Sequence, residues 1–244
     1  MKHSISRKIR STVDQAEISH FSSHAEGWWD KDGTYSPLHK MIPPRMEFLI
    51  SSIGSVKGLD ILDIGCGGGL TCEPLARLGA NITGLDADPR AIAVARHHAD
   101  DMGLSITYHH GSAEELGKEK KRFDVVLALE IIEHVSDARA FVEACSNLVK
   151  PDGLIIFSTL NRTWKSYALG IVAAERVLNW APVGTHSWNK FVKPSELAHY
   201  CEQSDMTPEK ISGLVYRPLH GNFALHPHDL DINYFMVARK SQDR

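Results

Sequence analysis

The chain has 244 residues, of which 43% are hydrophobic and 23% are charged, so it can bury one substantial core. Its formal net charge of -3 argues against the basic surface that broad nucleic-acid binding requires, so we expect no nucleic-acid partner. The four cysteines form no C-x-x-C pair, which argues against a zinc ribbon or a disulfide framework. Because residues 1–10 lack an apolar core and no stretch reaches membrane-spanning length, we expect a cytoplasmic protein.

The first predicted strand, residues 60–64, runs into a glycine turn, Asp63-Ile64-Gly65-Cys66-Gly67-Gly68-Gly69, followed by a helix predicted over residues 70–78. Glycines let the backbone approach a ligand that a Cβ atom would block, and the helix start offers unpaired N–H groups. A dinucleotide fingerprint would need its third glycine at Leu70, and Asp63 places a negative charge where phosphates would lie. The turn therefore favours a cationic ligand over NAD.

These residues resemble the class I S-adenosylmethionine-dependent methyltransferases, whose first motif is an acid followed by G-x-G-x-G, matched by Asp63, Gly65, Gly67 and Gly69. The resemblance implies S-adenosylmethionine as the cofactor, whose ammonium and sulfonium groups suit an acidic pocket. A second strand, residues 81–86, ends in Asp86 at the spacing where an acid binds the ribose hydroxyls. The alternative for Asp86 is a helix N-cap before Pro89, for which Asp88 is better placed.

Strand and helix patterns alternate from residue 60 to residue 160, which predicts an α/β fold with a doubly wound parallel sheet. The family resemblance makes this a Rossmann-like seven-stranded sheet. The further strands are expected over residues 105–110, 123–129, 154–158, 210–216 and 232–239. Helices are expected over residues 89–102, 137–149 and 194–203, the second ended by the breaker residues 150–153. Ligands of such sheets bind beyond the carboxyl ends of the strands.

The third strand leads into Gly111-Ser112-Ala113-Glu114. In the family this loop meets the adenine through a backbone amide and an acid, which the resemblance assigns to Ala113 and Glu114.

A second group of chemical residues, Glu130-Ile131-Ile132-Glu133-His134, follows the fourth strand. On a helical turn, positions i, i+3 and i+4 share one face, which would bring two carboxylates and an imidazole together. One reading is a metal site of Glu130, Glu133 and His134, suited to Mg²⁺ or another divalent ion. A second makes His134 the general base for a hydroxyl, with Glu133 orienting it. A third makes these residues a solvated helix start.

Further motifs narrow the resemblance to the O-methyltransferases of ubiquinone biosynthesis, over about residues 21–240. They are E-x-x-E-H-V, Ser158 to Arg162, Gly184 to His186, Lys190 to Pro194, Trp28 to Asp30, Pro37 to His39 and Pro44-Arg45. The resemblance implies methylation of catechol-type hydroxyls on a 2-polyprenyl-6-hydroxyphenol and on 3-demethylubiquinol. It also implies that Arg45, Gly65, Asp86 and Leu129 contact the cofactor. Arg45 can pair with the cofactor carboxylate if residues 1–55 form a helical lid on a methyltransferase domain of residues 56–244.

The insertion at residues 163–190, after the fifth strand, carries Trp164, Tyr167, Ile171, Ala174 and Leu178 at helical spacing. This pattern fits an interfacial helix that contacts membrane lipid, and it equally fits a helix that covers the active site. The protein could then lie peripherally on the inner membrane, beside other proteins of ubiquinone synthesis. His186 is a candidate fourth metal ligand or a residue that orients the substrate hydroxyl.

Two other functions are compatible with some of these motifs. E-x-x-E-H also resembles metal-dependent methyltransferases of the terminal ribose of small RNAs, although the net acidity speaks against them. The chain could also be a non-catalytic S-adenosylmethionine-binding subunit of a quinone-synthesis complex, although the intact candidate base residues make that reading weaker.

Overall fold

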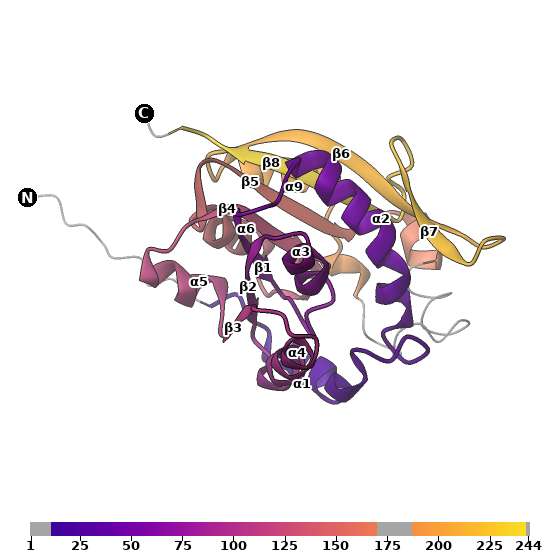
Figure 1. The fold of residues 1–244 in the computed structure, drawn as a ribbon. Coiled ribbons are helices and arrows are strands. Elements are labelled where there is room, and N and C mark those ends of the chain that lie inside the picture. Colours follow the sequence, from indigo (N-terminus) through magenta and orange to yellow (C-terminus); the bar gives the residue numbers. More distant parts are fainter. Residues whose placement is uncertain (1–10, 170–186, 243–244) are drawn as a thin grey trace, which may run out of the picture.

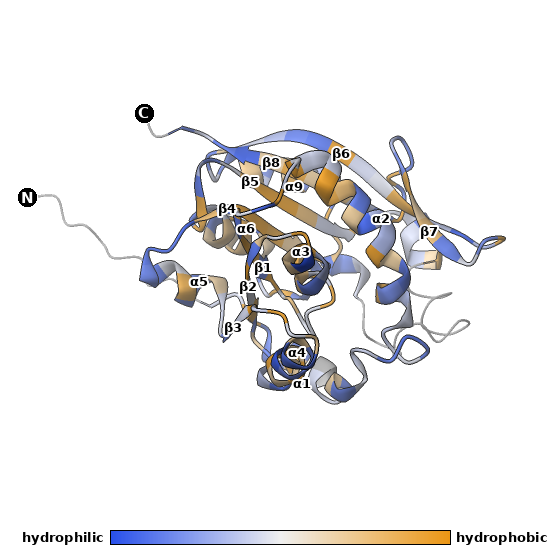
Figure 2. Cartoon of the chain, viewed as in Figure 1, coloured by the Kyte–Doolittle hydropathy of each residue, from blue (hydrophilic) through white to orange (hydrophobic). Residues whose placement is uncertain are grey.

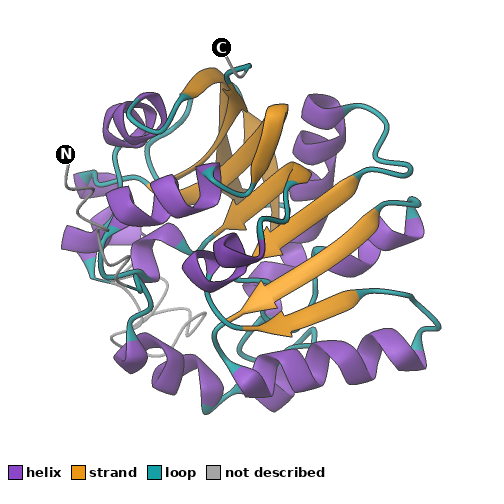
Figure 3. Ribbon diagram, turned by 90° about the vertical axis from the view of Figure 1, so that its left-hand side faces the viewer, coloured by secondary structure: helices purple, strands orange, loops and turns teal. Residues whose placement is uncertain are grey.

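The computed structural model describes residues 11–169 and 187–242, which form a central sheet with helices on both faces (Figures 1 and 3). The strand order is β3-β2-β1-β4-β5-β8-β6-β7. The strands are β1 (Asp60–Ile64), β2 (Asn81–Asp86), β3 (Thr107–His110), β4 (Phe123–Leu129), β5 (Val149–Leu160), β6 (Met206–Arg217), β7 (Asn222–His226) and β8 (Asn233–Lys240). The longer helices are α1 (Gln15–Ser22), α2 (Ser36–Ile53), α4 (Pro89–Asp101), α6 (Ala138–Ser146) and α9 (Pro194–Glu202). Shorter ones are η1 (Ala25–Gly27), α3 (Cys72–Arg77), α5 (Ala113–Leu116), η2 (Gly117–Glu119), η3 (Ile132–His134), α7 (Trp164–Ser166) and η5 (Trp188–Lys190).

The first five strands pair in parallel, and β8, β6 and β7 extend the sheet in antiparallel fashion from β5. The chain moves outward from β1 through β2 to β3 and then returns to place β4 on the other side of β1. The order of the strands therefore reverses between β1 and β4. In open α/β sheets, the crevice beyond the carboxyl ends at this point is where ligands bind.

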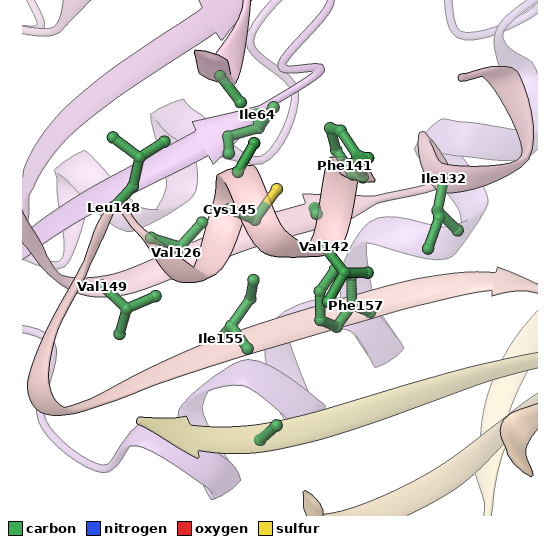
Figure 4. Packing of buried hydrophobic residues seen from close by; sticks show 14 of the residues in the cluster. Ile64, Val126, Ile132, Phe141, Val142, Cys145, Leu148, Val149, Ile155 and Phe157 are labelled. Carbon is green, nitrogen blue, oxygen red and sulfur yellow. The ribbon is translucent and has the colours of Figure 1, made fainter. Parts of the chain in front are cut away.

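Side chains of the central strands alternate between two buried clusters, as the two-residue period of a strand requires. On one face, Leu62 and Val126 pack under α6, whose Phe141, Val142 and Cys145 are shown in Figure 4. Side chains of α2, α3 and α4 cover the opposite face. Apolar residues accordingly concentrate in the central strands, and the outer faces of the helices are hydrophilic (Figure 2).

The doubly wound fold is confirmed, and β1, β2 and β4 have the bounds expected from the sequence. The sheet has one strand more than the seven expected, because β7 forms a hairpin with β6. The helix expected over residues 137–149 was too long, since α6 ends at Ser146 and β5 begins at Val149. The breaker residues form an irregularity inside β5, where Asp152 has φ 61° and the pairing with β4 shifts register.

The N-terminal segment, residues 11–55, packs on the body of the fold through α1, η1 and α2. In α2, Phe48 is 1% exposed and stacks on Phe235 of β8 with ring centroids 4.6 Å apart. Helix η1 contacts α4, and Ser22 at the end of α1 donates to Asp88, the N-cap of α4, at 3.1 Å. In the described parts of the chain, no helix is long and apolar enough to cross a membrane.

Candidate active site

A pocket lies beyond the carboxyl ends of β1, β2 and β4, at the point where the strand order reverses. Its empty space of about 870 Å³ includes the open solvent at its mouth. Its walls are the glycine turn after β1, the end of β2, the loops after β3 and β4, and one side of the N-terminal segment. Seven of the expected site residues line it: Gly65, Gly67, Asp86, Ala113, Glu114, Glu130 and His134.

The glycine turn has a backbone that only glycine adopts without strain, with φ of 74° at Gly65 and 52° at Gly67. A Cβ atom at Gly65 would lie 2.9 Å from the side chain of Ile131, and one at Gly67 would lie 2.3 Å from the ring of Trp28. Trp28 itself stacks on Tyr35 with ring centroids 4.0 Å apart. The turn is therefore packed on one side by the N-terminal segment.

Asp86 is the last residue of β2, and its carboxylate is hydrogen-bonded to the glycine turn. Its two oxygens accept hydrogen bonds from the backbone N–H groups of Gly67 and Asp88, each at 2.8 Å. Burial raises the pKa of Asp86, and these two hydrogen bonds oppose the shift. Asp88 forms the N-cap of α4 by accepting from the N–H of Arg90, so the cap role falls to Asp88 rather than to Asp86.

Glu114 lies in the first turn of α5, whose N-cap Ser112 forms a capping box with Glu115. Oε1 of Glu114 accepts from the backbone N–H and the hydroxyl of Thr12, at 3.0 and 2.6 Å. Oε2 is buried and has no hydrogen-bond partner among the described residues. A buried acceptor without a partner is costly, so a donor from a bound ligand would satisfy it.

Arg45, from α2, is 5% exposed and lies beside the pocket, where Nη1 donates to the hydroxyl of Thr71 at 3.2 Å. Its Nε and Nη2 atoms are buried and have no partner within the described residues. Burial lowers the pKa of Arg45, while the charges of Glu130 and Asp63 oppose this shift. Burial raises the pKa of Asp63 to about 6, against a hydrogen bond from Cys72 and the charge of Arg45.

The conformation of Glu130 contradicts the expectation that Glu130, Glu133 and His134 lie on one face of a helical turn. Glu130 has φ 53° and precedes the short helix η3, so the three residues do not share one face of a helical turn. The left-handed backbone points the Glu130 carboxylate at β5 and β8, where it accepts from Ser158 at 2.6 Å and from Asn233 at 2.9 Å.

Glu133 is 3% exposed, and its Oε2 accepts from the hydroxyl of Thr159 at 2.8 Å. Burial, together with the charge of Glu130, raises the pKa of Glu133. Glu133 and Leu129, the last residue of β4, are buried beside the pocket rather than among the residues that line it.

His134 lines the pocket, and its Nδ1 lies 3.0 Å from Oε2 of Glu17 in α1. Burial favours the neutral imidazole, but the hydrogen bond to Glu17 and the charges of Glu133 and Glu130 outweigh it and raise the pKa of His134. The same hydrogen bond lowers the pKa of Glu17 to about 2. The sequence predicted that Glu133 orients His134. In the structure, the hydrogen bond to the imidazole comes from Glu17 in the N-terminal segment.

Among the residues that the structure describes, no three His, Cys, Asp or Glu side chains are arranged to hold a metal ion. Glu130 and Glu133 offer the oxygen donors that Mg²⁺ prefers, but in this arrangement their carboxylates accept from Ser158, Asn233 and Thr159. His186, the expected fourth ligand, lies outside the described residues.

Thr12, Glu17 and Trp28 are site residues whose contacts the sequence did not predict. Each comes from the N-terminal segment and contacts a partner far along the chain, for example Glu17 and His134, which are 117 positions apart. Trp28 was noted only as part of a family motif. No local pattern pairs such residues, because their contacts depend on where the segment docks.

Comparisons with known proteins agree with this fold. Residues 62–157 match a family described as a methyltransferase domain. Magnesium protoporphyrin IX methyltransferase from Synechocystis PCC 6803 has the same fold, with a TM-score of 0.69 at 18% identity over 93% of this chain and 100% of that chain. The fold is that of the class I S-adenosylmethionine-dependent methyltransferases, and this chain is one of them.

Curated relatives define the family more narrowly. The chain is 44% identical to the ubiquinone biosynthesis O-methyltransferase of Cereibacter sphaeroides, over 93% of this chain and 97% of that protein. It is 46% identical to the enzyme of the same name from Rhodopseudomonas palustris, over 93% of this chain and 94% of that protein. The chain therefore belongs to the ubiquinone biosynthesis O-methyltransferase family.

Proposed function

We propose that this enzyme transfers a methyl group from S-adenosylmethionine to a catechol-type hydroxyl of a polyprenylated phenol or quinol during ubiquinone biosynthesis. The observation that carries the proposal is 44–46% identity, over nearly the whole chain, to relatives named for this reaction. The expected substrates are 2-polyprenyl-6-hydroxyphenol and 3-demethylubiquinol. The relatives' names favour neither a small-RNA methyltransferase nor a non-catalytic subunit.

The residues around the pocket fit S-adenosylmethionine. The two unpartnered nitrogens of Arg45 would bind its carboxylate, and Asp63 would balance its ammonium group. Gly65 and Gly67 give the backbone close access, Asp86 stands where ribose hydroxyls would bind, and Leu129 would contact the cofactor beside β4. The backbone of Ala113 and the unpartnered Oε2 of Glu114 would bind the adenine ring.

His134 is the proposed general base. When bound, S-adenosylmethionine supplies an electrophilic methyl group whose bond to sulfur breaks as its bond to the substrate oxygen forms. His134 accepts the proton of the attacking hydroxyl. A free phenol has a pKa of about 10 and is mostly un-ionised at neutral pH, so this proton transfer makes the oxygen nucleophilic as it attacks. Glu133 and Glu130, whose charges raise the pKa of His134, would stabilise the imidazolium that results.

A metal-dependent version of the reaction is the second candidate. The observation that favours it is that two carboxylates and an imidazole, Glu130, Glu133 and His134, lie within five residues of the sequence, and that Glu130 and His134 line the pocket. Their arrangement in this structure does not fit a metal ion, so no step of the proposed mechanism uses one. A chelator distinguishes the two candidates, because only the metal-dependent reaction stops and then resumes when Mg²⁺ is returned.

The segments at residues 1–55 and 163–190 are proposed to act as a lid and as a substrate cover that contacts membrane lipid. Supporting the second role, the side chain of Trp164 is 77% exposed, and Tyr167 and Leu169 beside it are also exposed. Ile171, Ala174 and Leu178 of the same pattern lie outside the described residues.

Flotation with lipid vesicles tests the proposed membrane contact, since Trp164→Ser should reduce the fraction of the protein that is bound to the vesicles. Association with other ubiquinone-synthesis proteins stays a proposal.

The test of the catalytic proposal is methyl transfer to a short-chain quinol by the wild-type enzyme and by His134→Ala. We expect His134→Ala to lose about 100-fold or more in kcat while it still binds S-adenosylhomocysteine. Full activity in this variant would remove His134 from the mechanism.

A further inference from the structure

The N-terminal segment brings a carboxylate to the proposed base. Oε2 of Glu17 lies 3.0 Å from Nδ1 of His134, and the side chains are only 21% and 10% exposed. A carboxylate that is ionised at neutral pH has no proton to give, so Nδ1 must donate this hydrogen bond. The other ring nitrogen, Nε2, then carries the lone pair of the neutral imidazole.

Glu17 and the segment that carries it are held by two sets of hydrogen bonds. Its Oε1 accepts from Nζ of Lys190 at 2.9 Å, and the same Nζ donates to Asp14 at 3.0 Å. On the other side, the carbonyl of Thr12 accepts from both the backbone N–H and the hydroxyl of Ser136, at 2.9 and 3.1 Å. The segment is thus fastened to the loop that carries His134.

Thr12 also connects the two halves of the pocket. Its backbone N–H and hydroxyl hold Glu114, on the proposed adenine side, while its carbonyl holds Ser136, two residues after His134. One docked segment therefore contacts both the cofactor side and the base side of the pocket.

We propose that Glu17 is a positioning residue for the methyl-transfer reaction: it fixes the His134 tautomer with the proton on Nδ1, so the base is complete only when residues 12–17 are docked. This inference rests on the proposed function. In the reaction, the O–H bond of the substrate breaks and its proton moves to Nε2 of His134. The resulting imidazolium keeps its hydrogen bond to Glu17, which remains a carboxylate. Other histidine bases are oriented in the same way, by a carboxylate that accepts a hydrogen bond from the ring nitrogen that does not react.

The kinetic test compares Glu17→Ala with Glu26→Ala. Both changes remove one carboxylate from the N-terminal segment, but only Glu17 contacts His134, whereas Glu26 is exposed and does not line the pocket. We expect Glu17→Ala to lower kcat by about 10- to 100-fold, with the Kd for S-adenosylhomocysteine changed less than about threefold. Glu26→Ala should keep kcat within about threefold. Equal losses in the two variants, or a loss in Glu17→Ala matched by an equal rise in Kd, would overturn the inference.

A second measurement separates this inference from the proposed function. Long-range ¹H–¹⁵N NMR, with the His134 signals assigned by their loss in His134→Gln, reports the tautomer without any substrate. At a pH above the raised pKa of His134, where the ring is neutral, the inference predicts a ring protonated on Nδ1 in the wild type and a loss of that preference in Glu17→Ala. A ring protonated on Nε2 in the wild type contradicts it. An inactive wild type with the expected tautomer would instead contradict the proposed reaction.

Discussion

The two buried nitrogens of Arg45 that lack partners within the described residues are the clearest single-residue sign of a ligand. A charged hydrogen bond contributes about 1.5–3 kcal/mol, so Arg45→Lys should weaken S-adenosylhomocysteine binding by about 10- to 100-fold. Calorimetric titration measures this Kd. Arg90→Lys, an exposed arginine on α4, is the control and should bind as the wild type does. Unchanged affinity in Arg45→Lys would place the cofactor carboxylate elsewhere.

The raised pKa of Asp63 leads to a prediction of how cofactor binding depends on pH. Burial raises its pKa to about 6 in the ligand-free protein, above its ordinary value of 3.8, so it becomes protonated as the pH falls through about 6. The ammonium group of the ligand needs the ionised form. We therefore expect the Kd for S-adenosylhomocysteine to rise by up to about tenfold between pH 7 and pH 5. Asp63→Asn should bind more weakly at pH 7 and lose this pH dependence.

At the scale of elements, α2 positions Arg45 by packing on the sheet. Phe48, one turn away on the same helix, stacks on Phe235. Phe48→Ala should lower the free energy of unfolding by about 3–5 kcal/mol and also weaken cofactor binding, because α2 loses its anchor. Glu47→Ala, an exposed neighbour, should change the free energy of unfolding by less than about 0.5 kcal/mol. Denaturant unfolding of both variants checks this, and equal effects would contradict it.

Elements with a strong local pattern were predictable from sequence. β1, β2 and β4 are short runs of mostly buried residues, and their ends were correctly predicted. Failures occurred where a tertiary contact overrides local preference. Glu130 leaves the helical region because its carboxylate is bound by Ser158 and Asn233 from two other strands. Similarly, Val149 pairs with Phe123 and becomes a strand residue instead of a helix end.

At the scale of the whole molecule, the N-terminal segment lines one side of the pocket through contacts that link distant parts of the chain. The family resemblance predicted a lid, but the docking of Thr12 on Glu114 and of Glu17 on His134 could not be read from either segment alone. Long-range contacts of this kind depend on the completed sheet, which places Glu114 and His134 at one edge.

A lid that contacts the cofactor side should be stabilised by the ligand. We expect amide hydrogen exchange of residues 12–22 to slow at least about tenfold when S-adenosylhomocysteine is added. Exchange in β6, which lies away from the pocket, should change much less and serves as the internal control. An N-terminal segment whose exchange is the same with and without ligand would not be acting as a lid.

The most direct test of the proposed function is to incubate the enzyme with methyl-labelled S-adenosylmethionine and a short-chain demethylubiquinol, and to identify the product by mass spectrometry. The proposal predicts one labelled methyl group on the ring hydroxyl in the wild type, and about 100-fold less product in His134→Ala. The contrary result would be no labelled quinol from a wild-type enzyme that binds the cofactor, together with label transferred to the terminal ribose of a small RNA.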